Sequence, residues 1–297
     1  MNKGYLIFGV LILLSSGLLK AQQSDSILYP LSTINHRAGI SFLELHDPYL
    51  SSLSYSGIGA RIEITQHRFL RTNLLLPDSQ QLFPAAGSSL SAFLRLSGSV
   101  ATTQNPASTA VVNYMGGNLT WGMNYHYRKI ENMVVLVGAA ADGEFGVKQN
   151  SRNINNPVNM DIAFNINAML GGRYFIQTKK RIIQLSGSYE MPLVGLMFVP
   201  YPGLSYYELY TSGRIGEALF FSSLHNRQGQ KLAFSVDFPL RNSTLHAGWR
   251  FHHLKYQGSG PVFVRDEHAL MLGITYDIFR SSGRRSRFPS NYIRSMY

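Results

Sequence analysis

Apolar and polar residues alternate along most of this chain with a period of two. In residues 58–65, isoleucine and alanine occupy the even positions, whereas the odd positions carry Gly59, Arg61, Glu63 and Thr65. Successive side chains of a β-strand point to opposite faces, so this period indicates strands. The same alternation recurs in residues 111–128, 161–177, 181–191, 244–256 and 268–279. The pattern therefore predicts an all-β protein.

A closed antiparallel transmembrane β-barrel is the architecture that we expect from these strands. Several segments run for 12 or more residues, which exceeds the ~5–6 residues of ordinary globular strands. The chain also has 17 tyrosines and 17 phenylalanines, which suits aromatic girdles at two membrane interfaces. A water-soluble sandwich of two sheets would alternate in the same way and is the main alternative.

About twelve strands are predicted, with ten and fourteen as alternatives. The candidate strands are residues 36–44, 54–66, 89–101, 111–128, 132–147, 161–177, 181–191, 204–212, 218–225, 230–238, 244–256 and 268–279. An even number places short turns at 129–131, 178–180 and 239–243 on the periplasmic side, and long connections at 148–160, 192–203 and 257–267 outside. Residues 67–88 are too long for an inner turn, so they either fold back as a plug or hide two short strands.

The first 21 residues have the features of a cleaved export signal: Lys3, an apolar run from Tyr5 to Leu14, and a small residue, Ala21. A membrane anchor is the alternative, but the apolar run is shorter than the ~20 residues that a spanning helix needs. Residues 22–279 are then the barrel domain and residues 280–297 a basic tail. Removal leaves 297 − 21 = 276 residues and a net charge of +11 − 2 = +9, because Lys3 and Lys20 leave with the signal.

Short motifs along the chain resemble an uncharacterised family of bacterial outer-membrane β-barrel proteins, catalogued as a domain of unknown function. The matching segments are residues 49–57, 152–157, 192–200, 205–210, 223–226 and 236–239, within a similarity that spans about 45–279. Residues 201–203 depart from the expected acidic residue, tyrosine and glycine. The resemblance implies a Gram-negative outer-membrane location and a barrel fold, and it carries over no activity, ligand or catalytic residue.

The alternation places a set of charged residues on the inward faces of the strands. These candidates for a polar network in the lumen are Arg61, Glu63, Arg95, Arg128, Arg173, Glu190, Asp237, Arg250 and Asp277. Buried charges are tolerated when they are paired. Such pairs either cross-link the strands and fill a narrow barrel, or line a path for ions.

A proline- and tyrosine-rich segment follows the strand that ends near residue 191. Proline cannot donate to a strand ladder, so Pro192, Pro200 and Pro202 indicate that the chain leaves the sheet here. Just beyond lie Tyr206, Tyr207 and Glu208. This candidate loop either enters the lumen as a constriction, caps the outer mouth, or packs rigidly.

Catalytic and metal motifs are scarce, so we expect no enzyme, metal or cofactor. The chain has no His-Glu-x-x-His, Gly-x-Ser-x-Gly or Walker loop, and no cysteine. A lipid hydrolase would need a serine beside a histidine near the outer rim, for which Ser235 and the histidines at 246, 252 and 253 are the only suggestion.

Two functions therefore lead: a passive or gated pore for small solutes, and a structural or docking barrel for a surface or secretion assembly. A lipid-modifying enzyme ranks third. The expected partners are outer-membrane lipid, the barrel insertion machinery, which residues 272–279 would engage as a closing strand, and other envelope proteins. The tail arginines could bind nucleic acid in another compartment, but not in an exported protein.

Overall fold

The computed structural model describes residues 32–70, 90–130, 132–150, 152, 157–178, 182–200, 206–240, 243–258 and 260–278. The strands are β1 (Ser32–His46), β2 (Ser54–Phe69), β3 (Leu90–Gln104), β4 (Val111–Ile130), β5 (Met133–Asn150), β6 (Val158–Gln177), β7 (Ile182–Phe198), β8 (Leu219–Ser223), β9 (Arg227–Pro239), β10 (Thr244–Tyr256) and β11 (Phe263–Ile278). Between β7 and β8 lie helix α2 (Tyr206–Thr211) and the 3-10 helix η2 (Ile215–Ala218). The proposed signal (1–21), the tail (280–297) and the candidate plug, except its first residues, lie outside the described residues.

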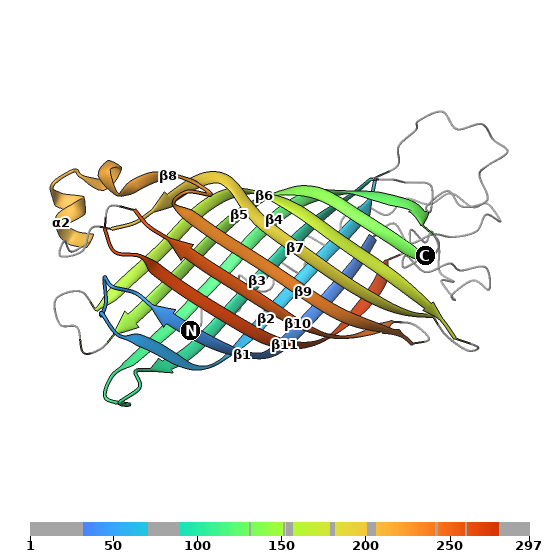
Figure 1. The fold of residues 1–297 in the computed structure, drawn as a ribbon, viewed down its shortest axis with the longest axis horizontal. Coiled ribbons are helices and arrows are strands. Elements are labelled where there is room, and N and C mark those ends of the chain that lie inside the picture. Colours follow the sequence, from blue (N-terminus) through green and yellow to red (C-terminus); the bar gives the residue numbers. More distant parts are fainter. Residues whose placement is uncertain are drawn as a thin grey trace, which may run out of the picture.

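The sheet closes on itself, which confirms the predicted antiparallel barrel and excludes the sandwich (Figure 1). Strand β1 pairs with β2 on one side and with β11 on the other, and β6 pairs with β7. Among the described residues, ten strands form the ring, in the order β1 to β7 followed by β9, β10 and β11. Closure leaves no edge along the wall, so the main-chain groups are paired within the protein.

The predicted number of twelve is wrong for two reasons. Residues 204–212 were expected to be a strand, but the described part is the short helix α2. Residues 218–225 and 230–238 were expected to be separate strands, yet β8 and β9 run in the same direction beside the same neighbour. Strand β8 pairs with Val194–Phe198 of β7, and β9 pairs with Gln184–Glu190. Both therefore occupy one position in the wall, and the strand number stays even.

Strand β7 continues past Pro192, contrary to the expectation that this proline ends the sheet. The register against β6 shifts here, because Ile166 pairs with Val194 and Asn167 pairs with Pro192. A β-bulge of this kind leaves one residue, Leu193, outside the ladder. The bulge accommodates the missing N–H of proline and lets the strand run on to Phe198.

The two ends of the barrel differ in the length of their connections. The short-turn end carries the turns after β4, β6 and β9, as the sequence predicted. The long-loop end carries the connections after β1, β3, β5, β7 and β10, and α2 and β8 lie there (Figure 1). The segment between β2 and β3 joins strands at the short-turn end.

The outer face of the barrel is a continuous apolar surface. Large exposed side chains come from the strands all round the ring, among them Ile62 on β2, Trp121 on β4, Phe164 on β6 and Leu272 on β11. Exposed aromatic residues gather where strands approach the short-turn end: Tyr125, Tyr127, Tyr174, Phe238 and Tyr276. Such an apolar band with an aromatic girdle suits a lipid bilayer. No helix among the described residues has the length and apolar character to cross a membrane.

Candidate functional site

Paired charges occupy much of the barrel interior, and most of the predicted lumen residues take part. Arg61 donates to Glu267 at 2.8 Å and to the Ser97 hydroxyl at 3.3 Å. Arg95 makes two hydrogen bonds, of 2.6 and 2.5 Å, to the two carboxylate oxygens of Glu190. The Arg61–Glu267 and Arg95–Glu190 pairs join strands that are not neighbours, so they cross-link the barrel through its lumen.

Glu63 is shared by two arginines. Its Oε1 accepts a hydrogen bond of 2.6 Å from Arg250 and a longer one of 3.4 Å from Arg37. Asp237, in turn, contacts Nδ1 of His246 at 2.5 Å and accepts a bond of 3.0 Å from Gln184. The predicted residues Glu63 and Arg250 are therefore partners of one another, and Glu63 and Asp237 also bind Arg37 and Gln184, which the sequence did not single out.

Three predicted lumen residues are not in these pairs. Arg173 lines a cavity that is described below. Asp277 is half-buried near the short-turn end of β11. Arg128 belongs to β4, but its side chain lies outside the described part of the chain.

Charged pairs nearer the long-loop end were missed by sequence reasoning. Glu144 accepts hydrogen bonds from Arg227 at 2.7 Å and Arg265 at 2.6 Å. The ammonium of Lys148 lies 2.5 Å from Asp47 and 2.7 Å from Asp161 and is inaccessible to water, with a side-chain exposure of 0%.

A sequence signal for these pairs exists. Residues 140–148 alternate in the same way as the other strands, and they carry Asp142, Glu144 and Lys148 on one face. Arg265 and Glu267, in contrast, belong to a segment that the sequence predicts to be a loop, whereas β11 already begins at Phe263.

Apolar side chains close the lumen at the long-loop end. A buried cluster there is made of Leu45, Leu50, Tyr55, Val112, Ala163, Met197, Leu254, Tyr256 and Phe263. Leu50 comes from the connection after β1. Asp47 holds this connection inward, because its carboxylate pairs with Lys148 and accepts a 2.7 Å hydrogen bond from Asn159. Side chains that line an open water path remain accessible to water, so the burial of this layer indicates a packed lumen at this level.

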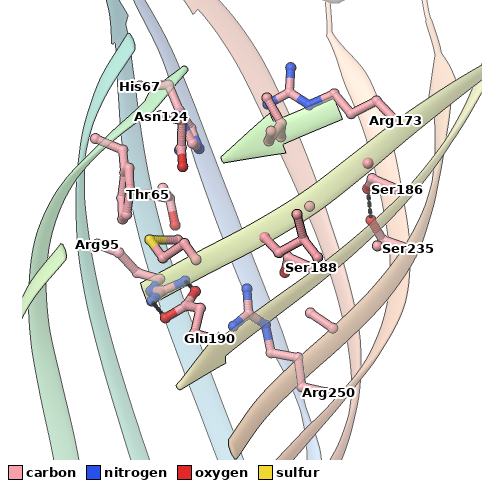
Figure 2. Close-up of a pocket in the computed structure, with 18 of the residues that line it drawn as sticks. Thr65, His67, Arg95, Asn124, Arg173, Ser186, Ser188, Glu190, Ser235 and Arg250 are labelled. Carbon is pink, nitrogen blue, oxygen red and sulfur yellow. Dashed lines mark hydrogen bonds and ion pairs between the residues drawn. The ribbon is translucent and has the colours of Figure 1, made fainter. Parts of the chain in front are cut away.

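A cavity of about 120 Å³ lies nearer the short-turn end. Its walls include Arg95 from β3, Arg173 from β6 and Arg250 from β10, which Figure 2 shows together with Glu190 and several serines. Ser186 and Ser235 hydrogen-bond to one another at 2.5 Å. The half of the lumen near the short-turn end is therefore polar and partly hollow.

The predicted loop or constriction is a rim structure. The Tyr206 hydroxyl donates to Asn159 at 2.7 Å and accepts the Met160 N–H at 2.6 Å. Burial raises the pKa of Tyr206 above its ordinary value, and the acidic residues Asp161 and Asp47 add to that effect.

The other residues of this loop are distributed differently. Tyr207 and Tyr210 are 75% and 73% exposed, and Glu208 also faces solvent. Pro200 is buried beside a smaller cavity of about 30 Å³. Pro202 lies outside the described residues.

The histidines considered for catalysis have other partners. His246 contacts Asp237, His253 contacts Asp266 at 2.6 Å, and Ser235 bonds to Ser186. His246 and Ser235 face the lumen near the short-turn end, whereas a lipid hydrolase needs its serine at the outer rim. In the part of the chain that the structure describes, no cluster of three or more histidines and carboxylates could hold a metal ion.

Several solved structures have similar folds at low sequence identity. The outer-membrane protease OmpT from Escherichia coli is 8% identical, with 82% of this chain and 95% of that chain covered and a TM-score of 0.44. The transport unit of the autotransporter AIDA-I from Escherichia coli is 9% identical, with coverages of 90% and 96% and a TM-score of 0.44. The translocator domain of the autotransporter NalP from Neisseria meningitidis is 10% identical, with coverages of 92% and 95% and a TM-score of 0.39.

A search of the curated protein sequences finds no match. The family model described as "Protein of unknown function (DUF3316)" matches residues 6–285, which is nearly the whole chain. The chain therefore belongs to the DUF3316 family of proteins of unknown function.

Proposed function

We propose that this protein resides in the outer membrane of a Gram-negative bacterium, with its long-loop end outside the cell. A cleaved signal peptide directs its export. The apolar outer surface and the aromatic girdle support the membrane location. The short turns at one end support the orientation, because outer-membrane barrels place short turns in the periplasm. Its partners are then outer-membrane lipid around the belt and the insertion machinery at strand β11.

We infer further that the barrel is closed and serves as a docking scaffold for a surface or secretion assembly. The observation that carries this inference is the packed lumen. Leu45, Met197, Leu254 and Phe263 are buried across the long-loop end, and the inaccessible Lys148 lies among carboxylates beside them. Passage of a solute would require this layer to move. The geometry thus favours the scaffold over the small-solute pore.

Helix α2 supplies the surface on which another envelope protein would dock. Tyr206 anchors the helix to β6 through two hydrogen bonds, and Leu209 is buried beneath it. Tyr207 and Tyr210 of this helix are exposed to solvent, and α2 lies beyond the long-loop end of the barrel wall (Figure 1). Tyrosines are enriched in protein interfaces because they give a large contact area at a low entropic cost.

Conductance measurements test the closed lumen. Purified full-length protein in a planar lipid bilayer is expected to give no stepwise conductance over the full voltage range. A parallel sample in the same detergent, shown to be folded by its heat-modifiable migration on a gel, controls for unfolded material. Regular conductance steps from the folded protein would favour the pore and contradict the scaffold.

Site-specific photo-crosslinking in intact cells tests the docking role. A photoreactive residue at Tyr207 is expected to give a discrete protein adduct that is lost when Tyr210 is also changed to serine. The same residue at Ile62, which is 59% exposed on the outer face of β2, should label lipid and give no such band. Equal labelling from both positions, or none from Tyr207, would count against a partner at α2.

A further inference from the structure

The cavity near the short-turn end has an excess of positive charge. Its lining includes four arginines, Arg37, Arg95, Arg173 and Arg250, and only two acidic residues, Glu63 and Glu190. Among the residues that line the cavity, guanidinium groups therefore outnumber carboxylates.

Two of these arginines, Arg37 and Arg250, share a single carboxylate. Glu190 is occupied on both oxygens by Arg95. Glu63 alone serves Arg250 and Arg37, and the contact with Arg37 is long at 3.4 Å. The Nε atoms of both Arg37 and Arg250 are buried and have no hydrogen-bond partner among the described residues. Asp237, the next carboxylate, makes its direct contacts with His246 and Gln184, and its charge acts on Arg37 only from a greater distance.

Neutral hydrogen-bonding groups complete the lining. Ser186, Ser188, Ser235, Thr65 and Asn124 all contribute to the cavity wall, which Figure 2 shows together with the arginines. One water needs about 10–15 Å³ by the same measure of volume. A cavity of about 120 Å³ therefore has room for a small polyatomic ion with some of its hydration water.

The position of the cavity decides how a ligand would reach it. His67 lies two residues before the end of β2, Phe93 three residues after the start of β3, and Arg173 four residues before the end of β6. These are the strand ends at the short-turn side. The apolar layer fills the lumen at the other end, and the barrel wall separates the cavity from lipid.

We propose that this cavity binds a compact water-soluble anion that carries a phosphate or carboxylate group and enters from the short-turn end. Guanidinium groups bind both kinds of oxyanion through paired, charge-assisted hydrogen bonds. Bound between Arg37 and Arg250, the anion supplies the negative charge that Glu63 alone cannot. This proposal does not depend on the scaffold role, because it concerns a different end of the barrel.

Binding is tested by titrating purified full-length protein with inorganic phosphate in one arm and succinate in a second, each against sodium chloride of equal ionic strength. Isothermal calorimetry and the thermal unfolding temperature are the readouts. Saturable binding of at least one oxyanion, accompanied by a rise in unfolding temperature, is expected.

Three variants locate the site. Arg250→Gln should weaken binding by roughly tenfold to a hundredfold, the range expected for a lost hydrogen bond to a charged group. Ser188→Leu fills the cavity without removing an ion pair, so it should abolish binding. This variant tests the site independently if Arg250→Gln does not fold. Arg214→Gln makes the same chemical change in an exposed pair on the opposite rim and should bind as the unaltered protein does.

Two outcomes would overturn the proposal. One is a response to phosphate and succinate that is no larger than the response to chloride. The other is oxyanion binding that persists unchanged in folded Ser188→Leu protein, since the ligand would then lie elsewhere.

Discussion

At the residue scale, the buried charges of the interior stabilise the fold only when each has a partner of opposite charge. Removing an ion from water costs several kcal/mol, and the loss is offset only when partners and hydrogen bonds are well placed. The alternation identified Arg95 and Glu190 separately as inward residues. Their partnership follows from the lumen, where residues 95 positions apart in the chain meet.

The Arg95–Glu190 pair provides a direct test of this dependence. Glu190→Gln should lower the free energy of unfolding by about 3–5 kcal/mol, because it leaves a buried guanidinium without its counter-charge. Urea unfolding of the detergent- or lipid-embedded protein, followed by tryptophan fluorescence, measures the change.

The control for that experiment is Glu217→Gln at the exposed Arg214–Glu217 pair, which should change stability by less than about 1 kcal/mol. A combined Arg95→Met and Glu190→Leu variant should recover much of the loss, since it removes both buried charges. If Glu190→Gln proves as stable as the control variant, the pair does not contribute as described.

At the element scale, local preference and tertiary context disagree at residues 204–212. Tyrosine-rich segments favour strands by propensity, and the sequence alone predicted one. The described part of the segment, residues 206–212, has no strand partner, whereas Tyr206 bonds to β6 and Leu209 is buried. Tertiary contacts at these two positions therefore decide in favour of a short helix.

Tyr206→Phe should release α2, because the variant loses both hydrogen bonds of the hydroxyl. At about 0.5–1.5 kcal/mol per bond, the free energy of local opening should fall by about 1–3 kcal/mol. Limited proteolysis measures this opening as faster cleavage between residues 201 and 218. Tyr207→Phe makes the same change on an exposed neighbour and should leave cleavage unaltered. Equal cleavage rates in the two variants would contradict the anchoring role of Tyr206.

The raised pKa of Tyr206 predicts that α2 loosens in alkali. The folded state favours the neutral phenol, so its stabilising effect is present below the unfolded tyrosine pKa of about 10 and is lost as pH rises toward the folded value. Proteolysis of the unaltered protein between pH 8 and 11 should accelerate above pH 10. The difference in cleavage rate between the unaltered protein and Tyr206→Phe should shrink over the same pH interval. A constant difference in rate would refute the titration of Tyr206.

At the scale of the whole molecule, the barrel is inverted with respect to a soluble protein, since its apolar side chains are outside and its charges inside. This arrangement explains why Ile62, exposed by 59%, is tolerated next to Arg61 and Glu63, which are buried. The two faces of one strand meet different solvents, and the sequence alternates accordingly.

Ile62→Arg tests that inversion. Arginine on the lipid face near mid-membrane is expected to cost about 2–4 kcal/mol of folding free energy in lipid bilayers. Ile215→Arg, also at an exposed isoleucine but on the rim beyond the wall, should cost less than about 0.5 kcal/mol. Urea titration of protein folded into vesicles compares them. Similar costs at both positions would argue against a bilayer around β2.

The sequence by itself determined the strand period, the all-β class and the opposite faces of the strands that it identified, because side-chain alternation is a local property that survives any error in strand number. The tertiary structure alone decided that ten strands close the ring, that β8 and β9 share one position, and which inward charges meet. Those partners depend on the number and stagger of the strands, which set the width of the lumen. The packed mouth and the arginine-rich cavity follow from the same closure, since their residues come from strands far apart in the chain.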